Sequence, residues 1–183
     1  CLATRVLGQA GWGRGSTRRP QMVAVVGGPG SFTGLRASGA TAAGYALGFG
    51  VSVVGVTRGE ALKPALEQAV AQNNGPPLQG WMLVTGARKG RVFVETAQGV
   101  LAVALASWCP PAQEAWLMAG DAAASLPMSA APLCAITTPS AEQIAVAACA
   151  RLAGVLPPRE ALPLYVDPPE AKRPAAGLRA APV

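Results

Sequence analysis

The chain has 183 residues, a formal net charge of +6, 51% hydrophobic residues and only 13% charged residues. This composition supplies a sizeable core and excludes a mainly disordered chain. Apolar runs are too short to span a membrane, the first ten residues lack the layout of a signal peptide, and four scattered cysteines suit a reducing compartment, so we expect a cytoplasmic protein. The dispersed basic residues indicate a solvated surface.

The first part of the chain alternates between apolar runs and helix-like segments. Residues 1–9 predict an edge strand, 22–26 a buried strand, 33–48 a helix, 51–56 a second buried strand and 58–71 a second helix. The strand–helix–strand order is typical of a βαβ unit with parallel strands.

A break at 73–77, Asn-Asn-Gly-Pro-Pro, separates this part from a region with hairpin signals. Strands are predicted at 81–85 and 91–96 around a basic loop, and further strands at 100–104 and 116–119. The mixture of βαβ and hairpin signals predicts an α/β or α+β fold with a mixed sheet.

The last predicted helix covers residues 140–153. Ser140 and Gln143 have the spacing of a capping box, and Gly154 follows the end of the segment. From Leu156 onward prolines dominate, so an extended tail is expected there.

A glycine-rich turn, residues 27–36 with the sequence GGPGSFTGLR, joins the first buried strand to the first helix. It is not a Walker A loop, because no Gly-Lys-Ser/Thr closes it, and its glycine spacing differs from that of a dinucleotide-binding turn. Its backbone N–H groups, with Ser31 or Thr33 as the helix N-cap, leave two interpretations open: an anion-binding turn or a tight structural turn.

The predicted helix at 33–48 contains four glycines, and a glycine costs about 1 kcal/mol relative to alanine in a helix interior. Small residues lie on every side of it, so tertiary contacts have to offset this cost. We expect one side to pack on its own sheet and another on a second chain; the alternative is a helix buried between two lobes of one chain. The candidate interface residues are Ser38, Gly39, Thr41, Ala42, Tyr45 and Ala46.

The glycine-rich turn resembles the signature motif of the bacterial TsaB (YeaZ) family. The residues of the motif are Gly28, Pro29, Gly30, Ser31, Phe32, Thr33, Gly34, Leu35 and Arg36. Weaker similarities follow in VSVVGVTRGEAL (51–62), GARKGRVF (86–93), the Gly120-Asp121 pair and LPLYV (162–166). The resemblance covers roughly residues 22–170.

This resemblance implies an α/β fold of the ASKHA (actin/Hsp70/sugar-kinase-like) type, with two lobes and mixed sheets. We expect residues 1–75 to form an N-terminal lobe that lacks the family's opening strand and first helix. Residues 76–158 are expected to form a C-terminal lobe, and residues 159–183 an extended proline-rich tail.

The resemblance also implies a non-catalytic role. Family members act in the complex that forms N6-threonylcarbamoyladenosine in tRNA, as partners of a TsaD-type catalytic subunit that a TsaE-type ATPase joins. They tend to self-associate, so a homodimer is expected when the chain is alone, and contact with tRNA is expected to be indirect or weak. No cofactor or metal is expected, because the sequence has no histidine with which to build a TsaD-type metal site.

Two other classes of function stay open. An ASKHA-type phosphotransferase or ATPase would use Gly28–Thr33 as a phosphate cradle and would need Mg²⁺ ligands, for which Glu60, Glu95 and Asp121 are the candidates. A basic RNA-binding module is the other class, although aromatic residues are not interleaved with the basic residues along the sequence.

Overall fold

The computed structural model describes Gln9, Gly11 and residues 19–88, 90–108, 115–126 and 131–167. The elements, in chain order, are β1 (Met22–Gly28), α2 (Phe32–Phe49), β2 (Ser52–Thr57), α3 (Arg58–Ala71), β3 (Gly80–Gly86), β4 (Arg91–Thr96), β5 (Gly99–Ala104), β6 (Trp116–Ala119), the 3-10 turn η1 (Ala123–Ser125) and α4 (Ala141–Leu152). These elements confirm the predicted α/β fold with mixed sheets and every helix and strand expected between residues 22 and 153. The edge strand expected at 1–9 lies almost wholly outside the described residues.

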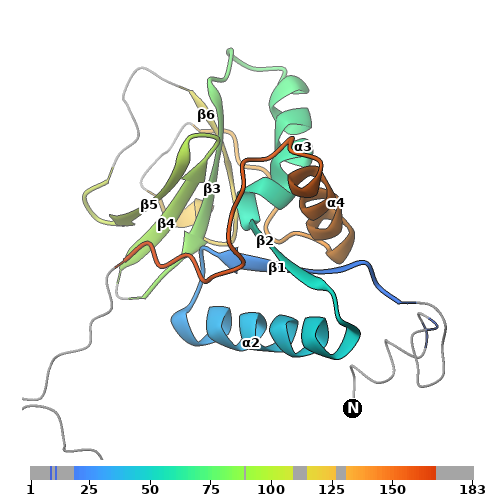
Figure 1. Ribbon diagram of the computed structural model, residues 1–183. Helices are drawn as coiled ribbons and strands as arrows, with labels where there is room; N and C mark the ends of the chain where they lie inside the picture. Colours follow the sequence, from blue (N-terminus) through green and yellow to red (C-terminus); the bar gives the residue numbers. More distant parts are fainter. Residues whose placement is uncertain are drawn as a thin grey trace, which may run out of the picture.

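The β1–α2–β2 unit is a parallel strand pair joined by a crossover helix, as the sequence predicts. Met22 pairs with Ser52 and Val26 with Val56, and an irregularity after Val26 brings Gly28 opposite Thr57. Helix α2 lies along one face of the pair, and α3 and α4 cover the other face (Figure 1). Because helices cover both faces, both strands are rich in valine with no alternation of polar residues.

The second sheet has the strand order β5-β4-β3-β6. Neighbours β5, β4 and β3 are antiparallel, whereas β6 is parallel to β3. Its inner face forms a core with residues that follow β6, among them Ala123 and Leu126. The sheet is therefore mixed, with the hairpin β3–β4 at its centre.

Helix α3 connects the two sheets. Leu62 and Leu66, which are 1% and 0% exposed, pack with Leu83 of β3 and Leu117 of β6. Ala61, on another side of the helix, packs with the valines of β2. Helix α4 packs back onto β1, β2 and α3. The break at 73–77 lies between α3 and β3, and the division of the chain into lobes stays a prediction.

The helix ends follow the capping signals in the sequence. Ser31, and not Thr33, is the N-cap of α2, because its Oγ accepts a hydrogen bond from the Gly34 N–H at 3.2 Å. Ser140 and Gln143 form the predicted capping box of α4. Among the described residues, no helix is both long enough and apolar enough to cross a membrane.

Candidate functional site

The glycine-rich turn lies where the carboxyl ends of four strands meet. Gly28 at the end of β1 pairs with Thr57 at the end of β2. Arg58, the next residue, reaches Thr85 near the end of β3 and Asp121 just after β6. In open α/β sheets, the carboxyl ends of parallel strands are the usual location of ligand sites. This edge is therefore the first place to look for a function.

A segment from the end of the chain crosses the glycine-rich turn. We call residues 155–167, which follow α4 without forming a helix or strand, the C-terminal strap. The Leu164 N–H donates to the Gly27 carbonyl at 2.7 Å. A Cβ atom added at Gly27 would lie 3.0 Å from the Leu162 carbonyl oxygen, and one at Gly28 would lie 3.0 Å from the Leu164 Cβ. The glycines allow backbone to approach backbone, which favours the interpretation as a structural turn.

The strap makes further contacts along its length. Ala161 lies so close to β2 that a Cβ added at Gly55 would be 2.9 Å from its Cα. At the far end of the strap, Asp167 accepts hydrogen bonds from Nη2 and Nε of Arg91 on β4, at 2.8 and 3.1 Å. The strap therefore runs from α4 across the β1–β2 pair to the second sheet (Figure 1). The sequence predicts the extended conformation of this segment but not these contacts, and residues 168–183 of the expected tail lie outside the described residues.

Arg58 joins the ends of the two sheets through a polar cluster. Its Nη1 donates to Thr85 Oγ1 at 3.1 Å and lies 3.5 Å from Asp121 Oδ2, and its Nη2 donates to the Thr137 carbonyl at 3.1 Å. Asp121 also accepts a hydrogen bond from the Gly86 N–H at 2.9 Å. All of these groups are used to hold the strand ends together.

Glu95 is a buried carboxyl group at the start of α3. Its side chain comes from β4, is 3% exposed and accepts a hydrogen bond from the Gly59 N–H at 2.9 Å. Burial raises the pKa of Glu95 to about 7, with a smaller contribution from Glu60, while hydrogen bonds from Thr57 and Gly59 and the charge of Arg159 act in the opposite direction. Glu95 therefore titrates near neutral pH.

Glu95→Gln is expected to be more stable than the wild type, by a difference in the free energy of unfolding that grows as the pH rises. The folded-state pKa lies above the ordinary value of 4.5, so the contribution of Glu95 to stability is fully present below pH 4.5 and is lost as the pH rises through about 7. The loss approaches roughly 3 kcal/mol at pH 8, because one pKa unit corresponds to about 1.4 kcal/mol. Thermal unfolding of the wild type and of Glu95→Gln between pH 4.5 and pH 8 measures this difference in stability.

The matched control for this prediction is Glu67→Gln. Glu67 is exposed and pairs with Lys63 one helical turn away. Its replacement is expected to leave the pH dependence of the wild type unchanged, since exposed pairs contribute little. Parallel pH curves for Glu95→Gln and wild type would contradict a raised pKa.

The three candidate Mg²⁺ ligands are each engaged by neighbouring groups. Glu60 accepts from the Thr57 N–H at 2.7 Å and pairs with Arg151, Glu95 accepts from the Gly59 N–H, and Asp121 pairs with Arg58. In the part of the chain that the structure describes, no three His, Cys, Asp or Glu side chains are grouped as metal ligands. These positions thus give the phosphotransferase alternative no support.

Helix α2 has one buried face and one open face. Leu35, Ala42 and Ala46 are 8%, 5% and 5% exposed and pack toward the β1–β2 pair, whereas Ser38 and Thr41 are exposed. Gly39 and Tyr45 are half-buried. The residues of the 28–36 motif are also divided between buried and exposed positions. Pro29 and Gly28 are buried, Gly30 is half-buried, and Ser31, Phe32, Thr33, Gly34 and Arg36 are exposed.

This arrangement corrects two expectations. Ala42 and Ala46, expected at an interface with a partner, instead hold α2 against its own sheet. The helix is also not buried between two lobes, because a Cβ added at Gly39, Gly44 or Gly48 would meet no atom within 4 Å. The open face has no partner within the described residues.

Residues outside the predicted site contribute to it as well. The Thr57–Glu60 capping box of α3 has a sequence signal, a threonine three residues before a glutamate, and could have been found from it. Tyr165 belongs to the LPLYV similarity at 162–166, but its contact with Phe32 at the start of α2 and the contact between Glu95 and Gly59 have no local sequence signal.

Comparisons with known proteins agree with this geometry. Residues 14–103 match the sequence profile of the family described as TsaD: tRNA N6-adenosine threonylcarbamoyltransferase. An uncharacterized protein with similarity to peptidase YEAZ, from Pseudomonas aeruginosa, superposes with a TM-score of 0.63 at 22% identity, covering 91% of this chain and 81% of that chain. YeaZ from Pseudomonas aeruginosa gives a TM-score of 0.61 at 22% identity, covering 87% and 79%. A search of curated proteins gave no match.

The fold is therefore the ASKHA type of α/β fold, with mixed sheets, that YeaZ represents. The profile match and the two structures support the resemblance of residues 28–36 to the TsaB (YeaZ) family.

Proposed function

We propose that this chain is a non-catalytic partner subunit of the bacterial complex that forms N6-threonylcarbamoyladenosine in tRNA. In this role it binds and supports a TsaD-type catalytic subunit, and a TsaE-type ATPase joins them. The same surface would serve self-association when the chain is alone. The observation that carries the proposal is the open, small-residue face of α2.

The open face of α2 is costly for a monomer. Gly44 and Gly48 are exposed on this face, each disfavours a helix by about 1 kcal/mol relative to alanine, and no contact within the described residues requires the missing side chains. The Ser38 and Thr41 hydroxyls donate to carbonyls of α2 itself, at 3.1 and 2.8 Å, so this face presents few unsatisfied polar groups. Such a smooth face allows the backbone of another subunit to approach closely.

The non-catalytic part of the proposal rests on side-chain chemistry. The sequence contains no histidine, and Glu60, Glu95 and Asp121 already have internal partners. Within the described residues, the edge where the strand ends meet has no group of side chains that could hold a metal ion, and its carboxylates are bound by neighbouring groups of the chain.

Gly44→Arg tests the proposal because it separates folding from association. In the free chain the new side chain has open space and improves the helix propensity, so the thermal midpoint is expected to rise or stay unchanged. A bulky side chain prevents close approach, so affinity for the TsaD-type subunit is expected to fall at least about tenfold, which corresponds to about 1.4 kcal/mol. Calorimetric titration and co-elution measure the affinity.

Two control variants complete this experiment. Gly44→Gln adds bulk without charge and is expected to weaken binding as well. Ala145→Arg adds the same side chain to an exposed position of α4 and is expected to leave binding unchanged. Undiminished binding by both Gly44 variants, or no complex with the wild type, would refute the proposed role.

A further inference from the structure

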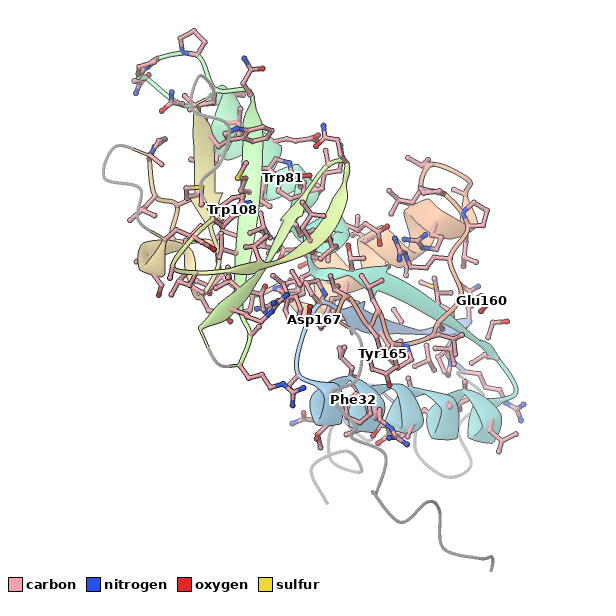
Figure 2. The ribbon with its side chains drawn as sticks, turned by 90° about the vertical axis from the view of Figure 1, so that its left-hand side faces the viewer. Phe32, Trp81, Trp108, Glu160, Tyr165 and Asp167 are labelled. Atoms are coloured by element: carbon pink, nitrogen blue, oxygen red, sulfur yellow. The ribbon has the colours of Figure 1, made fainter. Side chains whose placement is uncertain are left out.

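Three side chains form a partly exposed cluster at the start of α2, in which the planes of the two rings are inclined by 31°. The ring centroids of Phe32 and Tyr165 lie 5.2 Å apart, and the guanidinium carbon of Arg36 lies 5.1 Å from the centroid of Phe32. Phe32 begins α2 and Tyr165 lies in the C-terminal strap; Figure 2 shows the two rings next to each other. Although aromatic and basic residues are not interleaved along the sequence, the fold brings them together here.

The two rings are more exposed than large aromatic side chains usually are. Phe32 is 51% exposed and Tyr165 is 48% exposed. The strap does not depend on Tyr165 for its position, because the Leu164–Gly27 hydrogen bond precedes it and the Asp167–Arg91 ion pair follows it. Folding therefore leaves the exposure of this pair unexplained, and exposed aromatic pairs commonly mark binding surfaces.

The chemistry of this cluster suits an unpaired nucleobase as its ligand. Bases from single-stranded RNA stack on aromatic rings and on arginine guanidinium planes. Arg36 has no ion-pair partner within the described residues, so its charge is available to a phosphate, and the whole chain carries a net charge of +6. A ligand that is planar, aromatic and anionic fits all three side chains.

We propose that Phe32, Tyr165 and Arg36 form a stacking platform for an unpaired base of single-stranded RNA. The platform gives this chain a direct RNA contact of its own. The inference rests on these three side chains and does not depend on the partner-subunit role.

The experiment uses a short single-stranded RNA that contains 2-aminopurine, whose fluorescence falls when it stacks. The full chain is expected to quench it. Phe32→Ala and Tyr165→Ala are each expected to weaken binding about 5- to 150-fold, because stacking contributes about 1–3 kcal/mol per base. Phe32→Tyr and Tyr165→Phe keep the rings and are expected to bind like the wild type.

Further measurements separate stacking from other effects. Arg36→Ala is expected to reduce the salt dependence of binding, since it removes a charge that pairs with phosphate. Leu47→Ala, an exposed apolar position of the same helix, is expected to leave RNA binding by the chain alone unchanged. A fully paired RNA duplex of the same sequence is expected to bind more weakly than the single strand.

Several outcomes would overturn the platform. The proposal is wrong if the chain quenches no fluorescence either alone or in complex with the TsaD-type subunit. It is also wrong if the two alanine variants lose single-strand and duplex binding to the same extent. Capture of the TsaD-type subunit is measured in parallel on the same variants. If the alanine variants lose that capture and keep RNA binding, the rings contact a protein and the RNA proposal is wrong.

Discussion

Gly120→Ala is expected to prevent stable folding. Gly120 follows β6 with a φ of +104°, and a Cβ there would lie 2.1 Å from the Val84 carbonyl oxygen and 2.8 Å from the Val84 carbonyl carbon and nitrogen. Val84 is 0% exposed in the central strand β3, which is hydrogen-bonded on both sides and cannot move away. We expect a loss of more than about 4 kcal/mol, which is exceptional for a single substitution. Soluble yield, circular dichroism and urea unfolding measure it.

Gly90→Ala is the matched control. Gly90 also has a positive φ, +69°, but a Cβ there would meet nothing within 4 Å. This variant pays only the cost of the left-handed backbone, about 1–2 kcal/mol. Equal destabilisation by the two variants would mean that β3 and β6 separate easily, which would contradict a fixed contact at Gly120.

Arg151→Ala is expected to be the next most damaging change. The Arg151 Nη2 lies 2.5 Å from Glu60 Oε2, with side-chain exposures of 4% and 15%, and Nη1 donates to the Pro157 carbonyl at the start of the strap. The pair is held by charge, since within the described residues neither Nη2 nor Nε of Arg151 has a well-aligned hydrogen bond. Removing one partner of a buried pair costs about 3–5 kcal/mol, because the other charge is left without compensation. Urea unfolding measures the loss.

A double-mutant cycle isolates this ion pair. Glu60→Gln retains an oxygen that can accept from the Thr57 N–H and so preserves the helix cap. The double variant is expected to be less destabilised than the sum of the single variants, since residues in contact couple. Lys63→Ala, which removes an exposed pair with Glu67, is expected to cost less than about 1 kcal/mol. A cost for Arg151→Ala no larger than that of Lys63→Ala would contradict its role.

The secondary structure was largely predictable because its signals are local. Valine-rich runs mark β1 and β2, and the Ser140–Gln143 capping box marks the start of α4. The orientation of α2 was not predictable in this way. Alanine and glycine occur on all sides of it, so no apolar stripe identified Ala42 and Ala46 as the buried positions and Ser38 as an open one.

The parts of the site that escaped prediction depend on contacts between distant segments. The sequence suggests Glu95 only as a candidate Mg²⁺ ligand, and it does not predict the contact with Gly59, which comes 36 residues earlier in the chain. The glycines at 27, 28 and 55 suggest close approach, but nothing near them identifies the strap as the segment that approaches. Long-range pairing of this kind requires the fold.

The strap also imposes an order of events during synthesis. Arg91 precedes its partner Asp167 by 76 residues. At about 5–20 residues per second, the β3–β4 hairpin waits roughly 4–15 s for the strap to be made. The β1–β2 pair and α2 are complete long before Tyr165 arrives to join Phe32. A chain that stops between residues 153 and 161 thus contains both sheets but has an uncovered glycine-rich turn and half of the aromatic pair.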